Sequence, residues 1–326
     1  MHKFIIIAMA LLLAGCVTSS GGTMAPEAAT GFLGMKSDDI KIDTAKAFAG
    51  KKDVVIGSFK VGFVTYNKAS QTAGGGLMGG MAGRASAKTN LEGVSDSTMQ
   101  QITDAAYADF TSLLKANGYN VVDRSTIVST SEYKKASVET SPQRDADSVL
   151  VPKADITFFA PTGMPLHGKG FAFSSPLVAF GTLGEKTGVP VLDVEYIVNF
   201  ANADGYGGSF RSTAAVNVGQ GISVVPGGRV TIYGGQAGTF SNNIGSVTLG
   251  QPVFSTEEFA TVSEMTTDGE NALGYAANAF SAVLGGGTSI SREYAVKADA
   301  GKYAAISKSV LNKANVKLVG TMKASR

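Results

Sequence analysis

The stretch DVVIGSFKVGFVTY, residues 53–66, decides the fold class of this chain. Its β-branched and aromatic residues predict a strand. A glycine-rich stretch, a helical pattern over residues 97–117 and a second strand pattern within GYNVVDRSTI, residues 118–127, follow it. This order of strand, loop, helix and strand predicts a mixed α/β chain of the α+β type, with an antiparallel or mixed sheet and helices packed on one face.

The helix expected at residues 97–117 carries a signal at each end. Ser97 and Gln100 have the spacing of a capping box at its start. Gly118 stands where a glycine commonly ends a helix. Between them, apolar residues recur at helical spacing and predict one buried face: Met99, Ile102, Ala106, Phe110 and Leu113.

Two later segments alternate between apolar and polar residues. Residues 189–203 and 209–225 predict half-buried strands on either side of the turn NADGYGG. In the first of them, Asp193, Glu195 and Asn199 face away from the apolar side, which is made of Leu192, Val194, Tyr196, Val198 and Phe200. We therefore expect a long β-hairpin region at about residues 165–250. Helices are expected at residues 268–284 and after a cap at Asp299, and a last strand at residues 316–320.

The chain opens with a short basic start and an apolar run from Phe4 to Leu13. About ten residues make a helix of about 15 Å, half the roughly 30 Å of a bilayer core, which suits a signal peptide rather than a membrane span. Leu13, Ala14, Gly15 and Cys16 follow, and the whole run resembles the lipobox of bacterial lipoproteins. The resemblance implies that residues 1–15 are removed and that Cys16 is acylated. Residue 17 is Val rather than Asp, so the resemblance also implies that the protein is sorted to the outer membrane.

Cys16 is the single cysteine among 326 residues, so its acylation would leave no disulfide, thiol nucleophile or thiolate metal site. Ser, Gly, Thr, Ala and Pro dominate residues 17–30. We expect residues 16–50 to form a disordered, lipidated tether for a periplasmic domain at residues 51–326. The formal net charge of +2 lacks the basic excess of a nucleic-acid-binding protein, and no nucleic-acid partner is expected.

Candidate chemistry is sparse. One histidine, His167, remains after the signal peptide, and without a G-x-S-x-G elbow we interpret it as a surface-loop residue. GMPLHGKG, residues 163–170, resembles a phosphate loop, but Gly170 stands where Ser or Thr would hold Mg²⁺. We predict no catalytic residue, no metal site and no cofactor.

The segment GGGLMGGMAGRASA, residues 74–87, is unusual for its composition. Its glycines are typical of a flexible loop. Leu77, Met78 and Met81 are unusual in a merely solvated loop, so these three residues form a candidate contact loop. It would close against a membrane, a pore axis or a neighbouring subunit.

The order of elements after the lipobox resembles that of the curli-secretion lipoproteins and related periplasmic lipoprotein domains. The residues that carry the resemblance are Val54–Tyr66, Ser97–Asn117, the strand Tyr119–Arg124 and VLDVEYIVNFANADG at residues 191–205. The family implies an oligomeric transmembrane pore built from long segments between the core strands. Residues 171–183 and 209–233 are the candidate segments here, although Pro176 interrupts the first and Gly219 and Gly221 weaken the second.

We expect a non-enzymatic lipoprotein that acts as a scaffold or assembly factor in envelope assembly or secretion. Its partners would be membrane lipid, reached through acylated Cys16, other envelope proteins and, in a homo-oligomer, further copies of itself. Two alternatives stay open: an oligomeric, curli-secretion-like pore in the outer membrane, and an anchored hydrolase that works with carboxylates.

Overall fold

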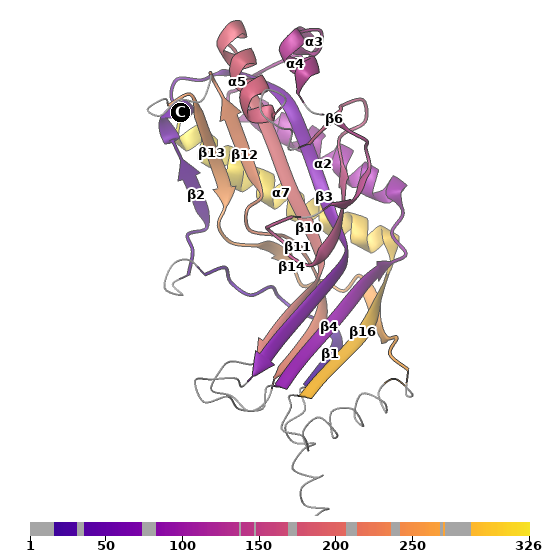
Figure 1. Cartoon of the computed structure of the whole chain (residues 1–326). Coiled ribbons are helices and arrows are strands. Elements are labelled where there is room, and N and C mark those ends of the chain that lie inside the picture. Colours follow the sequence, from indigo (N-terminus) through magenta and orange to yellow (C-terminus); the bar gives the residue numbers. More distant parts are fainter. Residues whose placement is uncertain are drawn as a thin grey trace, which may run out of the picture.

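A computed structural model describes ten parts of the chain (Figure 1). They are residues 16–30, 36–73, 83–136, 138–146, 148–168, 175–206, 214–235, 242–267, 270 and 288–326. Of the helix expected at residues 268–284, only residue 270 is among the described residues.

A large mixed sheet forms the centre of the structure. Its main path runs β15 (Ala260–Glu264), β16 (Thr288–Ala298), β4 (Gly83–Glu92), β3 (Asp53–Ala73), β10 (Val191–Tyr206), β12 (Arg229–Tyr233), β13 (Ile244–Leu249), β2 (Ile40–Asp43). Six further strands join it: β1 (Cys16–Thr23), β5 (Asn120–Val122), β7 (Gln143–Ala146), β8 (Ala154–Phe159), β11 (Ala215–Val224) and β14 (Val253–Ser255). β3 pairs with β4 antiparallel and with β10 parallel, so the predicted mixed sheet and α+β class are confirmed. β6 (Val138–Glu139) and β9 (Leu166–His167) form a separate pair.

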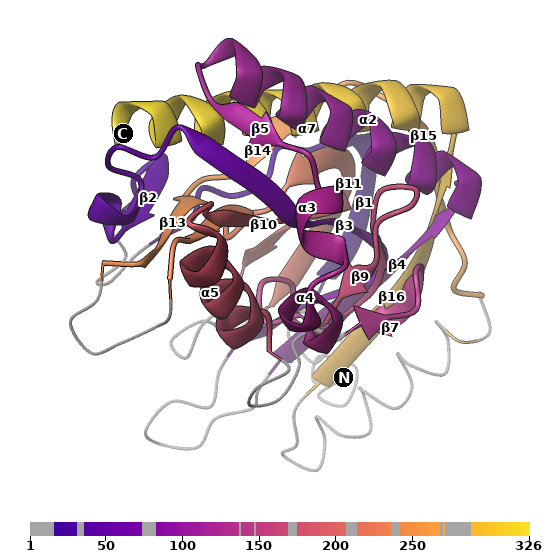
Figure 2. The same ribbon diagram turned by 90° about the horizontal axis from the view of Figure 1, so that it is seen from above.

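Two long helices, α2 (Asp96–Ala116) and α7 (Ala300–Ala324), lie side by side on one face of the sheet, as expected (Figure 2). The other face carries α5 (Pro176–Thr187), and beside it α3 (Ser125–Val128) and α4 (Ser131–Lys135). A short 3-10 helix, η2 (Ala45–Ala47), follows β2. Helices therefore cover both faces and not only the one expected, because β3 and β10 are apolar on both sides at this end: Val54 and Leu192 face the long helices, while Val55 and Val191 pack under α5.

The ends of the long helices follow local side-chain chemistry. The Ser95 hydroxyl accepts a hydrogen bond from the Thr98 amide at 3.2 Å, so α2 begins two residues earlier than the predicted capping box. Gly118 has a φ of 81° and ends this helix as predicted. The Asp299 cap of α7 is confirmed by a 2.9 Å bond from the Lys302 amide. The strand expected at residues 316–320 is wrong, since Leu318 and Val319 continue the buried face of α7.

A buried polar network ties both long helices to the sheet. The Tyr196 hydroxyl of β10 donates to Asn315 Oδ1 of α7 at 2.7 Å. Asn315 Nδ2 in turn donates to Asp109 Oδ2 of α2 at 2.7 Å and to the Ala106 carbonyl at 3.1 Å. Burial raises the pKa of the Tyr196 phenol, so it stays protonated and acts as a donor. Both the amide oxygen and the amide nitrogen of Asn315 thus have hydrogen-bond partners. These bonds make the packing of α7 on the sheet specific.

The expected tether at residues 16–50 is wrong for the described part of that segment. β1 pairs in parallel with β11, and β2 pairs with β13. Val17 and Phe48 are fully buried in the core. Gln251 fixes the stretch between β1 and β2, because its side chain bonds the Ala29 amide, the Ala29 carbonyl and the Ser37 carbonyl at 2.7–3.0 Å. Pairing with distant strands therefore orders β1 and β2, although the composition of this segment is typical of disorder.

Two glycines of β11 make room for this N-terminal segment. A Cβ atom at Gly221 would lie 2.4 Å from the Met24 carbonyl oxygen, and one at Gly219 would lie 2.6 Å from Met24 Cβ. Both distances are too short for real contacts, so the close crossing requires glycine. These residues weaken β11 as an isolated strand, as the sequence indicated, but they allow a second chain segment to pack on it.

The segment at residues 171–183, expected to be a strand, contains the start of α5 instead. The Ser175 hydroxyl accepts from the Val178 amide, and Pro176 occupies the first helical turn, where its missing N–H costs nothing. β10 and β11 do pair antiparallel, so the hairpin itself is confirmed within the expected region.

Gln220 offers a direct test of how the edge of the sheet is held. Its Oε1 accepts from the Phe259 and Ala260 amides at 3.0 and 2.8 Å, and its Nε2 donates to the Ala260 carbonyl at 2.7 Å. Gln220→Met keeps the volume but leaves two buried amides without acceptors. We expect it to lower the free energy of unfolding by about 2 to 4 kcal/mol, measured by urea denaturation. Gln101→Met, on the exposed side of α2, should change it by less than about 0.5 kcal/mol; equal losses would refute this role.

Candidate functional site

Cys16, the cysteine of the expected lipobox, begins a strand. Cys16 is the first residue of β1 and pairs with Ala215, the first residue of β11. Leu13, Ala14 and Gly15 lie outside the described residues. No slack chain therefore separates Cys16 from the folded sheet.

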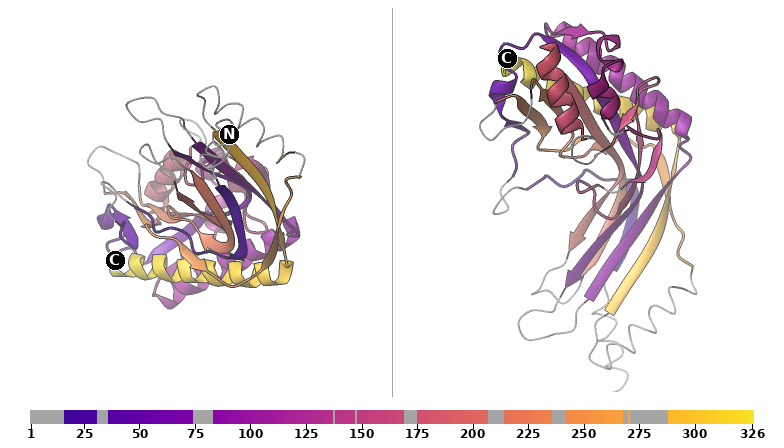
Figure 3. Two further views of the ribbon diagram at one scale, coloured as in Figure 1. Left: turned by 90° about the horizontal axis from the view of Figure 1, so that it is seen from below. Right: turned by 45° about the horizontal axis from the view of Figure 1, so that its top comes forward.

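Several other strand ends gather at the end of the sheet where Cys16 lies (Figures 1 and 3). Ala73 of β3 pairs with Gly83 of β4, which also pairs with Thr288 of β16. Tyr206 of β10 pairs with Ala215. The candidate contact residues Leu77, Met78 and Met81 lie outside the described residues, between the ends of β3 and β4.

The long strands have two different faces near this end. Ala69 and Ala87 form a cross-strand pair that packs in the core, and Gln71 pairs with Ala85 on the same side. The opposite face pairs Lys68 with Lys88 and Thr72 with Arg84. Lys88 lies 3.9 Å from Glu293 of β16, which offsets part of the repulsion. The outer face of β3 and β4 is therefore polar and cationic.

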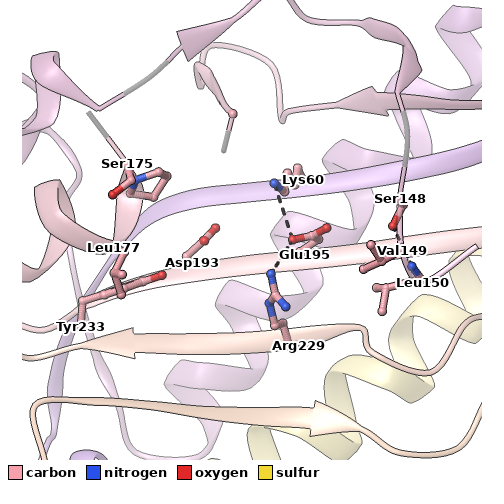
Figure 4. A pocket seen from close by; sticks show the side chains of 12 residues that line it. Lys60, Ser148, Val149, Leu150, Ser175, Leu177, Asp193, Glu195, Arg229 and Tyr233 are labelled. Atoms are coloured by element: carbon pink, nitrogen blue, oxygen red, sulfur yellow. Dashed lines mark hydrogen bonds and ion pairs between the residues drawn. The ribbon is translucent and has the colours of Figure 1, made fainter. Parts of the chain in front are cut away.

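A cavity of about 270 Å³ lies on the sheet face that carries α5, away from the long helices (Figure 4). β3, β10 and β12 form its floor. Glu195 of β10 pairs directly with Lys60 of β3 and with Arg229 of β12, so these three side chains share one face of the sheet. Its lining residues are Lys60, Ser148, Val149, Leu150, Gly168, Ser175, Pro176, Leu177, Asp193, Glu195, Arg229 and Tyr233.

Glu195 shares its charge between two cations. Its Oε2 lies 3.6 Å from Lys60 Nζ and 3.1 Å from Arg229 Nη2. The Glu195 and Lys60 side chains are each only 16% exposed, so this group is screened less than a surface ion pair. Lys60 also lies over the Phe158 ring, 5.6 Å from its centre. The three groups together carry a net charge of +1.

Asp193 lies on the same face, two residues before Glu195. Its Oδ1 atom is fully buried and accepts no hydrogen bond from any described residue. Burial raises the pKa of the Tyr233 phenol, and the charge of Asp193 raises it further. Tyr233 therefore stays neutral at the edge of the cavity, and Asp193 Oδ1 has no hydrogen-bond donor among the described residues.

Aromatic packing holds the wall of the cavity in place. The Tyr133 hydroxyl of α4 donates to the Gly57 carbonyl of β3 at 2.9 Å. The His167 ring packs edge-on against Tyr133 and Phe180, with ring centres 5.1 and 5.2 Å apart. The prediction of a surface-loop histidine is wrong, because His167 is only 2% exposed. It packs between Tyr133 of α4 and Phe180 of α5.

A larger cavity of about 460 Å³ lies between α2, β5 and α3. Two of its charged groups already have partners: Arg124 donates to the Gly163 carbonyl, and Asp123 accepts from the Ser125 amide at 2.7 Å. Across the described ranges, no cluster of three or more His, Cys, Asp or Glu residues is arranged to hold a metal ion. We therefore take the cavity at Asp193 as the candidate ligand site.

Sequence reasoning placed Asp193 and Glu195 on the polar side of a strand but did not identify the site. Lys60 and Arg229 were missed, because they come from strands far away in the chain. The sequence does contain one signal: Lys60 is the only charged residue between Asp53 and Lys68. A charge at such a position usually has a partner on a neighbouring strand.

The helix that walls the cavity is held by an ion pair that should respond to acid. Lys186 of α5 contacts Glu132 of α4 and holds the pKa of Glu132 down to about 2. Because the folded pKa lies below the unfolded value, the stabilisation is complete above about pH 5 and is lost as pH falls towards 2. We expect amides of α5 to lose exchange protection over that range in the wild type, measured by hydrogen–deuterium exchange.

In Glu132→Gln, protection of α5 should be lower near neutral pH and should change less with acid. Glu185→Gln removes an exposed charge from the same helix and is the matched control. If Glu132→Gln and the wild type showed the same acid profile, the pair would not hold α5.

Comparison with known proteins leaves the function to be argued from these residues. No protein-family model, no curated protein and no solved structure matches the chain. Within the described ranges, no helix has both the length and the apolar character needed to cross a bilayer. What remains is the geometry of two features: the strand end at Cys16 and the charged cavity.

Proposed function

We propose that the chain is a lipid-anchored outer-membrane protein whose α+β domain acts as a non-enzymatic scaffold or assembly factor in the cell envelope. The observation that carries the proposal is the position of Cys16 as the first residue of a paired strand. Acyl chains on Cys16 would bury their CH₂ groups in the bilayer at about 0.8 kcal/mol each, and two or more chains anchor a protein stably. The end of the sheet would then lie directly at the membrane surface.

The same geometry supports a role in contacts with other envelope proteins. The main path of the sheet ends in β15, whose Ala260 backbone is bonded by the Gln220 side chain, and in β2, whose outer edge has no strand partner among the described residues. Ile42 of β2 is 47% exposed, which is high for an apolar strand residue. Open strand edges readily pair with another chain, so the edge of β2 is a candidate surface for partners or for self-association.

The burial of His167 also bears on the anchored hydrolase. A general base must reach the proton that it abstracts, and His167 is enclosed by Tyr133 and Phe180. Glu195 is engaged by two cations, which favours a structural role. These contacts favour the non-enzymatic proposal over acid–base chemistry at the cavity.

A curli-secretion-like pore is the second candidate. β3 has 21 residues and β10 has 16, more than the 9 to 11 that a membrane strand needs. Against it, the outer face of β3 and β4 carries Lys68, Arg84 and Lys88. A lysine or arginine facing lipid at the bilayer midplane costs about 2 to 4 kcal/mol. The scaffold is therefore the function that the geometry supports best.

The decisive experiment compares the full-length protein with Cys16→Ser. We expect the wild type to fractionate with outer membranes and the variant to be soluble in the periplasm, because only the wild type can be acylated. Size-exclusion chromatography with light scattering, in mild detergent, should give a monomer or small oligomer. Val17→Ile, a conservative change one residue along, should keep the acyl group, which mass spectrometry of the N-terminal peptide would detect.

Two results would contradict the proposal. Retention of Cys16→Ser in the membrane would show that the anchor lies elsewhere. A large, discrete ring from the wild type would replace the scaffold with the pore.

A further inference from the structure

The cavity at Asp193 contains a buried carboxylate oxygen without a hydrogen-bond donor among the described residues. Leaving such an atom unpaired costs on the order of 1 to 3 kcal/mol, and more for a charged group. The residues opposite Asp193 in the sheet are Ser58 and Thr231, which carry no charge. The nearest cations of the lining, Lys60 and Arg229, are engaged by Glu195 instead. One end of the cavity is therefore anionic.

The other end of the cavity is cationic. Lys60 and Arg229 share the single carboxylate of Glu195 and leave one positive charge in excess. Arg229 is 48% exposed and presents a guanidinium with further free donors. Asp193 and Glu195 lie two residues apart on β10, a separation of about 7 Å along the strand. Because Lys60 and Arg229 both contact Glu195, the cationic end begins about that far from Asp193.

Apolar side chains flank the two charged ends. Leu177, at the start of α5, lies on the Asp193 side, and Val149 and Leu150 lie on the Glu195 side (Figure 4). Such walls suit the methylene groups of a ligand. The volume of about 270 Å³ limits the ligand to a small molecule.

We propose that this cavity binds a small, free amino carboxylate: its ammonium group pairs with Asp193, its carboxylate faces Lys60 and Arg229, and a short methylene chain lies against α5. The proposal goes beyond the scaffold function and does not depend on acylation of Cys16. It assigns to Asp193 a binding role that folding alone does not require.

The test uses three probes of similar length, titrated by isothermal calorimetry into the full-length protein in a non-ionic detergent. A zwitterionic detergent is unsuitable, because its headgroup carries the same pair of charges. 5-Aminopentanoate has both charges, pentylamine has the cation alone and pentanoate has the anion alone. We expect 5-aminopentanoate to bind at least about tenfold more tightly than either single-charge probe, the factor expected for one charge-assisted hydrogen bond.

Asp193→Asn separates binding from folding. We expect it to weaken the binding of 5-aminopentanoate by about tenfold or more. The thermal midpoint of the free protein should stay the same or rise, because an unpaired buried charge is removed. Asp155→Asn makes the same change on β8 at an exposed position outside the cavity and should leave binding unchanged.

Four results would overturn the proposal. They are the absence of heat with 5-aminopentanoate, equal binding of pentylamine, undiminished binding by Asp193→Asn, and a lower thermal midpoint for Asp193→Asn. The last would make Asp193 a structural residue.

Discussion

The placement of β10 at the centre of the sheet is the constraint on which the rest of the structure depends. This strand pairs with β3 on one side, and with β12 and then β11 on the other. Its strict alternation sends Leu192, Val194 and Tyr196 towards the long helices and Asp193 and Glu195 towards the cavity. A shift of register by one residue would exchange these two sets, burying two carboxylates in the core. The core and the candidate site are therefore fixed by one choice of register.

Buried polar groups then decide how the other elements attach to this sheet. Tyr196, Asn315 and Asp109 connect β10 to α7 and α2 through bonds of 2.7 Å. Gln220 and Gln251 attach the edge segments in a similar way. Gln220 bonds the amide and the carbonyl of Ala260, and Gln251 bonds the carbonyls of Ala29 and Ser37. Hydrophobic packing alone would allow these elements to slide, whereas an unpaired buried amide is costly. The specificity of the fold thus resides in a few amide side chains.

The sequence predicted what depends on local pattern. The alternation of β10, the buried face of α2 and the Asp299 cap of α7 are all confirmed, because each follows from spacing within one segment. The N-terminal segment was missed, since its order comes from pairing with β11 and β13, which are about 200 residues away. The cavity was missed for the same reason: Lys60, Glu195 and Arg229 meet only across three strands. The sequence therefore showed the polar face of β10 but not its partners.

The pairing of β1 has a consequence for how the two features would work together. Eleven residues of β10 separate Glu195 from Tyr206, whose pairing partner Ala215 is also paired with Cys16. At about 3.3 Å per residue, the cavity lies about 35 Å from that end of the sheet. A flexible tether would let this distance vary, whereas a paired strand fixes it. If Cys16 carries the anchor, the cavity is held well clear of the lipid headgroups and open to the periplasm, so a small ligand can reach it while the strand end remains at the membrane.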